Sequence, residues 1–243
     1  MASTSEIGHA KNVANFQDLI EFVTAYGATY NPSKNSLKLP QLIALKASAD
    51  ATLADVITKN TNYNNKVNER ITAFSGLKSL STRLVNALQT TDATTETIGN
   101  AKTFNRKMQG KKASSSQTPT DPNTPAPNTI STSQQSYDQL IQHLAGLNSV
   151  LEAETSYTPN ETDLQVATLQ TKIADLTAKN TAVATAYASI SNSRIARNET
   201  LYSSSTGLVE TANEVKKYIK SVFGASSPQF AQVKGIQFKI IKN

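Results

Sequence analysis

Residues 169–190 read LQTKIADLTAKNTAVATAYASI, and this stretch decides the fold class. Its seam residues alternate spacings of four and three: Leu169, Ile173, Leu176, Asn180, Val183, Tyr187 and Ile190. That alternation is the heptad pattern of a helix that packs along another helix. The pattern continues to Val222, and residues 42–88 follow it more loosely. The sequence therefore predicts an all-α protein, a long-helix bundle or antiparallel coiled coil.

Short motifs around each long segment occur twice. FQDLI at 16–20 returns as YDQLI at 137–141, and YNP at 30–32 returns as YTP at 157–159. The separation grows from 121 residues to 127, and later pairs are 130 and 131 apart. We predict a tandem duplication with a first helical repeat at 1–112 and a second at 137–243. The two repeats are expected to pack together as one bundle.

A segment of different composition joins the predicted repeats. Residues 113–136 hold four of the eight prolines and one charged residue. A segment with few large apolar groups cannot offset the entropy lost when its chain becomes ordered. We therefore predict a flexible linker that serves as a spacer.

Each long segment can form one of two structures. Each is either one helix of more than 50 residues, about 80 Å at 1.5 Å per residue, or a hairpin that turns near 61–65 and 191–193. Asn and Ser at these midpoints favour the turn. Each segment has one glycine, Gly76 or Gly207, and no internal proline. The unbroken seam favours the continuous helix.

The ends of each repeat carry their own signals. Helical spacing at 13–23 and 137–151 predicts a first helix, which Gly27 and the Tyr-x-Pro motifs at Tyr30 and Tyr157 end. Residues 226–241 begin as a capped turn and finish with alternating apolar residues. We expect an extended tail that docks on the bundle, or a strand that awaits a partner.

Positive charge gathers at the C-terminal end of each repeat. The formal net charge is +6, and two acid-free segments supply +5 (97–112) and +6 (215–243), so the rest sums to 6 − 11 = −5. Lysines in a last helical turn complement the helix dipole, and they also attract phosphate backbones. The candidate polyanion-binding residues are Lys102, Arg106, Lys107, Lys111, Lys112, Lys216, Lys217 and Lys220.

Composition excludes several classes of chemistry. No cysteine occurs, so disulfides, thiolate metal sites and cysteine nucleophiles are absent. No nucleophile elbow, phosphate-binding glycine loop or dinucleotide fingerprint is present. Glu210 and Glu214, four residues apart, are typical of a solvated helix face. We expect no enzymatic activity, no catalytic residue and no cofactor.

Neither histidine predicts a functional site. His9 follows Glu6 with the Glu-x-x-His spacing of di-iron bundles, but such a site needs this motif twice, so no metal is expected. His143 is interpreted as a boundary residue of an amphipathic helix. The N-terminus lacks the charged and apolar regions of a signal peptide, and no apolar run reaches membrane-spanning length. We expect a cytoplasmic protein, although export by another route stays open.

Arg194 and Arg197 lie in the middle of the second seam, where apolar residues are usual. A buried pair of this kind fixes the register of a helix pair when it meets carboxylates. We predict a register-setting core polar pair that meets carboxylates across the bundle, such as Glu69 of the other repeat. The alternative is that the two arginines mark the place where the seam opens.

The closing motif VKKYIKSVFG at 215–224, followed by Ser227, Phe230 and KGIQF at 234–238, resembles a group of uncharacterised helical proteins of Bacteroidota. The resemblance spans most of both repeats. It implies long helices, and it implies no activity, cofactor or site residue.

The leading hypothesis is a non-enzymatic helical scaffold or protein-interaction module, which binds a protein partner or itself. The alternative is weak, sequence-independent binding of nucleic acid or another polyanion through the lysine-rich repeat ends. Little aromatic interleaving accompanies those lysines, which disfavours sequence-specific recognition of bases.

Overall fold

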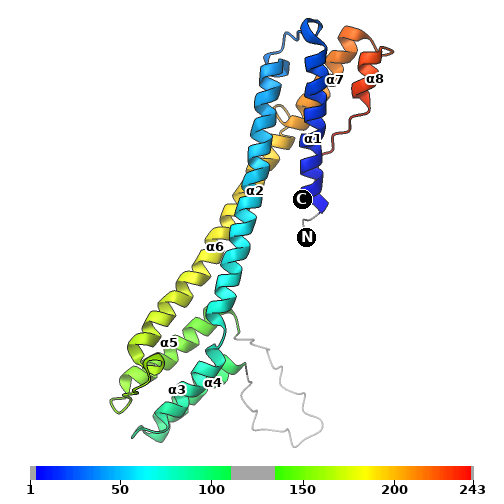
Figure 1. Cartoon of the computed structure of the whole chain (residues 1–243). Coiled ribbons are helices and arrows are strands. Elements are labelled where there is room, and N and C mark those ends of the chain that lie inside the picture. Colours follow the sequence, from blue (N-terminus) through cyan, green and yellow to red (C-terminus); the bar gives the residue numbers. More distant parts are fainter. Residues whose placement is uncertain (1–3, 111–134, 242–243) are drawn as a thin grey trace, which may run out of the picture. The chain divides into compact units, whose positions relative to one another are not determined.

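The computed structural model describes residues 4–110 and 135–241, which fold as helices and connecting turns (Figure 1). No strand occurs in these two ranges, so the all-α prediction is confirmed. The first half, residues 4–110, contains α1 (Thr4–Ala25), α2 (Leu39–Phe74), α3 (Leu77–Leu88) and α4 (Thr95–Gln109). The second half, residues 135–241, contains α5 (Tyr137–Ala153), α6 (Val166–Tyr202), α7 (Leu208–Phe223) and α8 (Pro228–Lys234). Three 3₁₀ turns complete the fold: η1 (Gly27–Thr29), η2 (Asn35–Leu37) and η3 (Thr162–Leu164).

The chain divides into two compact units, and each unit takes residues from both halves. Unit 1 comprises Met1–Tyr63 and Ala186–Asn243, and unit 2 comprises Asn64–Thr185. The unit boundaries therefore lie inside α2 and α6. The predicted linker at 113–136 lies, apart from Gln135 and Ser136, outside the described residues. Where the sequence suggested one bundle of two repeats, each unit combines the beginning of one half with the end of the other.

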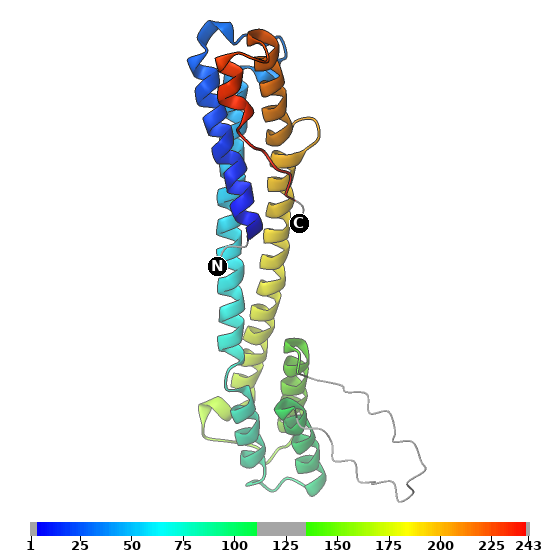
Figure 2. The ribbon, with the colours of Figure 1, turned by 90° about the vertical axis from the view of Figure 1, so that its right-hand side faces the viewer.

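In unit 1, α1 packs against α7 and α8 (Figure 2). The residues with helical spacing in α1 are all buried, as predicted: Val13, Phe16, Leu19, Ile20 and Val23. They share a core with buried residues of α7: Leu208, Val209, Ala212, Val215 and Ile219. Burying one such large side chain contributes about 1.5–3 kcal/mol, so this apolar face holds α1 in place.

In unit 2, α5 packs against α3 and α4. Buried leucines of α5 share a core with residues of α3 and α4: Leu144, Leu147, Leu151, Leu84, Leu88 and Met108. The helices approach closely at Gly146, where a Cβ atom would lie 2.3 Å from a ring carbon of Phe104. A methyl group at this position would therefore force the Phe104 ring to move.

The two long helices run through the predicted hairpin positions without turning. Helix α2 is 36 residues long and α6 is 37, and both continue across 61–65 and 191–193. The prediction of helices longer than 50 residues is wrong, because α2 ends at Phe74 and α6 at Tyr202. Gly76 has a φ of 77°, the left-handed conformation in which glycine ends helices.

Both Tyr-x-Pro motifs make the same turn after the first helix of each half. The hydroxyl of Tyr30 donates to the carbonyl of Leu37 at 2.7 Å, and that of Tyr157 donates to the carbonyl of Leu164 at 2.9 Å. Burial raises the pKa of both phenols, and that of Tyr157 reaches about 12. Each phenol is therefore a neutral donor that anchors the chain between two helices.

The C-terminal residues confirm the prediction of a docked, extended tail. Residues 236–241 have no regular secondary structure and lie against α1. The side chain of Asn12 donates to the carbonyl of Lys239 at 2.7 Å and accepts from its N–H at 3.0 Å. Asn15 donates to the carbonyl of Gln237 at 2.6 Å. Two asparagines three residues apart therefore satisfy the backbone of the tail on one face of α1.

Candidate polyanion-binding site

The last turns of α7 present its lysines beside α8. The buried face of α7 carries Leu208, Ala212, Val215 and Ile219, which places Lys216, Lys217 and Lys220 on the remaining surface. Helix α8 starts at Pro228, where the hydroxyl of Ser227 accepts from the N–H of Phe230 at 3.1 Å. This cap brings the short helix back along α7.

A groove of about 300 Å³ lies between these two helices. Its lining consists of Asn213, Lys216, Lys217, Lys220, Phe230 and Lys234. We call this the lysine groove. Four ammonium groups and an amide line it together with one aromatic ring, and no carboxylate is among the lining residues. Four positive charges around one hollow raise the local concentration of anions.

Lys216 is the most buried cation of the lysine groove. Its Nζ donates to the carbonyl of Ile236 at 2.7 Å and lies 5.8 Å from the centroid of the Phe238 ring. Burial lowers the pKa of this ammonium group. No carboxylate of the described residues pairs with it. Its charge is therefore partly desolvated, which favours an anion nearby.

The other three lysines of the groove are more exposed than Lys216. Lys217 lies 3.9 Å from Glu210, and its side chain is largely exposed, so this ion pair contributes little. The Nζ of Lys220 lies 5.9 Å from the centroid of the Phe230 ring, within the range of a cation–π contact. Lys234 forms no ion pair with any residue in the described ranges. These side chains can turn toward a ligand at small energetic cost.

The structure brings together three of the predicted residues, Lys216, Lys217 and Lys220, in unit 1. Lys102, Arg106 and Lys107 lie on α4, which belongs to unit 2. Lys107 approaches the ring of Phe104 at 5.7 Å. Lys111 and Lys112 lie outside the described residues.

Sequence reasoning missed three residues of the lysine groove. Asn213 could have been found, because it precedes Lys216 and Lys217 by three and four residues on the same helix. Phe230 and Lys234 follow a turn whose direction depends on the Ser227 cap and on packing, so helical spacing alone could not place them.

The predicted core arginines differ in their burial. Arg197 is 1% exposed, and its Nε and Nη2 donate to the amide oxygen of Asn198 at 3.1 and 2.8 Å. Arg194 is only partly buried. The predicted partner, Glu69, pairs instead with Lys66 at 2.8 Å and Lys179 at 3.2 Å. That part of the prediction is wrong, because Glu69 finds two ammonium groups within unit 2.

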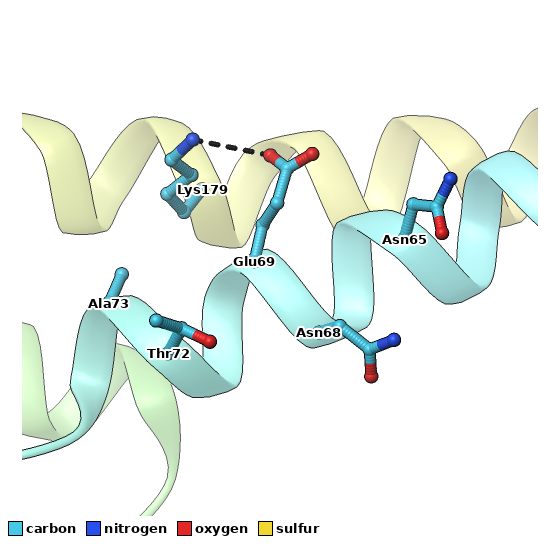
Figure 3. Close-up of a pocket in the computed structure, with 6 residues that line it drawn as sticks. All are labelled: Asn65, Asn68, Glu69, Thr72, Ala73 and Lys179. Atoms are coloured by element: carbon cyan, nitrogen blue, oxygen red, sulfur yellow. Dashed lines mark hydrogen bonds and ion pairs between the residues drawn. The ribbon is translucent and has the colours of Figure 1, made fainter.

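Glu69 and Lys179 also border a second hollow, of about 590 Å³ (Figure 3). Its other lining residues come from α2: Asn65, Asn68, Thr72 and Ala73. The hydrogen bond from Lys66 is the first cause, and that from Lys179 the second, of the lowered pKa of Glu69. A carboxylate so held is a poor base. The hollow is lined by two amides, a hydroxyl group, a methyl group and the Lys179–Glu69 ion pair.

Both histidines are buried in the fold. His9 is buried, and its Nδ1 lies 2.6 Å from the hydroxyl of Tyr202, while the Glu6 side chain is not described. His143 is 8% exposed rather than at a boundary. No group of three or more metal-binding side chains occurs in the part of the chain that the structure describes. Within the same part, no helix is long and apolar enough to cross a membrane.

No family model, curated protein or solved structure matches this chain. The resemblance to helical proteins of Bacteroidota stays a prediction. The site must therefore be interpreted from its own geometry.

Proposed function

We propose that the protein is a non-enzymatic helical interaction scaffold that binds a phosphate-bearing polyanion through the lysine groove. The observation that carries the proposal is the half-buried Lys216. It forms no ion pair with a carboxylate of the described residues, and it lies among three further lysines. Nucleic acid is the polyanion that we propose, in a weak and sequence-independent mode. Its phosphates match the point charges of lysines, and one phenylalanine offers little recognition of bases.

The other polar groups of the fold support a scaffold because they hold main chain in place. Asn12 and Asn15 hold the tail, and Tyr30 and Tyr157 hold the turns. These groups make hydrogen bonds within the protein, whereas the lysines of the lysine groove are available to bind an anionic ligand. A cytoplasmic location would give this groove access to nucleic acid.

We further infer that the scaffold arose by duplication of one helical unit and that its long helices form an antiparallel coiled coil. Buried residues of α2, Leu42, Ala49 and Val56, have counterparts 127 residues later in Leu169, Leu176 and Val183. In unit 1, Asp55 contacts Ser193 and Tyr63 contacts Tyr187, so the numbering rises in one helix as it falls in the other. Both observations favour this origin and this packing.

Binding to a mixed-sequence RNA or DNA, measured by fluorescence anisotropy at two salt concentrations, tests the proposed function. The test variant combines Lys217→Gln, Lys220→Gln and Lys234→Gln, and it spares Lys216 because that lysine holds the tail. We expect the test variant to lose affinity at low salt. The slope of log K against log salt should also fall in magnitude by about 2 to 3, since each lost phosphate contact removes about 0.9 on a duplex.

A matched control removes the same charge elsewhere. Lys11, Lys38 and Lys78 are exposed and form no ion pair within the described ranges, so Lys11→Gln, Lys38→Gln and Lys78→Gln change net charge alone. The control should bind nearly as well as the unchanged protein. An equal loss in both variants, or no salt-sensitive binding by the unchanged protein, would rule the lysine groove out as the site.

A further inference from the structure

The core of unit 1 joins two parts of the chain that are distant in sequence. Helix α1 and the beginning of α2 come from the first half, while the end of α6, α7 and α8 come from the second. Contacts across this boundary are specific. The hydroxyl of Tyr26 donates to the carbonyl of Gln229 at 2.9 Å, and the rings of Tyr30 and Tyr218 meet edge to face at 5.2 Å. Helix α1 therefore buries its apolar face on the second half.

Unit 2 uses the halves in the opposite order. Helix α5 and the beginning of α6 come from the second half, and they pack on the end of α2, α3 and α4 from the first. Phe74 meets Tyr137 edge to face at 4.7 Å, and Arg83 forms an ion pair with Asp163. Both units are therefore interfaces between the first and second halves.

The packing of α1 and α5 shows what each half lacks alone. Without α7 and α8, α1 would share a core only with residues of its own half such as Leu42 and Ala49, and without α3 and α4, α5 would share one only with residues such as Leu169 and Leu176. The other half completes the cover of both apolar faces. A second copy of the chain carries the same half, with the same contacts.

We propose that two copies of this chain assemble by exchanging halves, so that the first half of one copy forms both units with the second half of the other. Every contact across the halves is kept in the exchanged dimer, because the same residues meet. The balance between closed monomer and exchanged dimer then depends on the protein concentration during folding, compared with the effective concentration of two linked halves. This assembly goes beyond the binding proposed for the lysine groove, and its test changes none of the residues that line the groove.

Two single-cysteine variants test the exchange, because the chain has no cysteine of its own. Asp55 in the first half accepts a hydrogen bond from Ser193 in the second half at 2.5 Å, so thiols at these positions would face each other. Asp55→Cys and Ser193→Cys are made in separate full-length chains, unfolded together, refolded at a series of concentrations and treated with a short bismaleimide crosslinker. The products are separated on a denaturing gel.

A covalent dimer of the two variants is expected, and its yield should rise with the refolding concentration. Position 55 of one chain meets position 193 of another only if the halves have exchanged. The matched control replaces Asp55→Cys by Asp50→Cys, since Asp50 is exposed on the same helix and pairs with Lys46. A yield equal to that of the control, or no dimer at any concentration, would overturn the proposal.

A second pair protects the test against a variant that fails to fold. Tyr63 and Tyr187 also belong to different halves, and their ring centroids lie 5.9 Å apart. Tyr63→Cys and Tyr187→Cys should give the same concentration-dependent dimer, with folding of each chain checked by circular dichroism. If neither pair crosslinks in folded protein, the halves do not exchange.

Discussion

The phenols of Tyr30 and Tyr157 show how single residues set the turns of this fold. We expect Tyr30→Phe to lower the free energy of unfolding by about 1–3 kcal/mol, because the buried carbonyl of Leu37 loses its donor. Urea unfolding followed by circular dichroism measures this loss. Tyr63→Phe is the control, since the Tyr63 hydroxyl makes no hydrogen bond within the described ranges and should change stability by less than about 0.5 kcal/mol. Equal losses would contradict the role given to Tyr30.

A second prediction at the residue scale concerns His143. Burial is the first cause, and the charge of Lys107 the second, of the lowered pKa of this imidazole. The unfolded chain therefore binds a proton more readily than the folded chain below the ordinary pKa of about 6.5. Stability should be unaffected by this group above pH 7 and should fall as the pH drops below about 6.5.

The measurement compares the free energy of unfolding at pH 7.5 and pH 5.5 in the unchanged protein and in His143→Leu. Carboxylates with a lowered pKa, such as Glu69 and Glu154, lose their stabilisation at more acidic pH. The other histidine, His9, is the same in both proteins, so the difference between the two proteins isolates the His143 imidazole. The variant should show a smaller pH dependence. An identical pH dependence in both proteins would show that His143 does not contribute.

At the scale of elements, two glycines predict opposite effects of one substitution. Gly76 has a positive φ at the junction of α2 and α3, so Gly76→Ala should destabilise the protein by about 1 kcal/mol. Gly99 lies inside α4, and an added Cβ would meet no atom within 4 Å. Gly99→Ala should therefore stabilise the protein by up to about 1 kcal/mol.

Thermal unfolding of both variants tests this pair, since the added methyl group is the same. A lower Tm for Gly76→Ala and a higher Tm for Gly99→Ala are expected. Shifts in the same direction would contradict the assignment of one glycine to a junction and the other to a helix interior.

The sequence predicted the helices and their buried faces, but the motif match and the buried positions give different alignments of the first helices of the two halves. The motif match pairs Phe16 with Tyr137, a separation of 121 residues. The buried positions 15, 16, 19, 20 and 23 of α1 match 143, 144, 147, 148 and 151 of α5, a separation of 128. The difference is 128 − 121 = 7, one heptad. A shift of seven residues leaves the same face inward, so periodicity alone cannot detect it.

The ends of the long helices could not be predicted from the sequence, for a different reason. A heptad seam continues past Phe74 and Tyr202 in the sequence, and a glycine costs only about 1 kcal/mol inside a helix. Whether a helix stops there depends on what the next segment can pack against. The lysine groove was predicted only in part. Lys216, Lys217 and Lys220 were predicted because they gather in an acid-free segment at the end of a helix, whereas the contribution of Lys234 depends on the path of α8.

At the scale of the whole molecule, the halves should hold together without a covalent link. A protease site inserted between Gln117 and Thr118 allows the chain to be cut after folding. We expect the two fragments to elute as one species in gel filtration and to separate only in denaturant, since both cores contain residues of both fragments. Fragments that separate in native buffer would contradict the pairing of halves in the two units.

The boundaries of the units inside α2 and α6 also govern the order of events on the ribosome. When residue 110 has been made, neither unit has all its residues, because 133 of the 243 are still to come. The chain between the end of α1 at Ala25 and the end of α7 at Phe223 is 223 − 25 = 198 residues long. At 5–20 residues per second, the apolar face of α1 therefore waits roughly 10–40 s for α7 to be completed. Two nascent chains on one messenger RNA would therefore display the same uncovered helix at the same time, which makes neighbouring ribosomes a natural place for copies to meet.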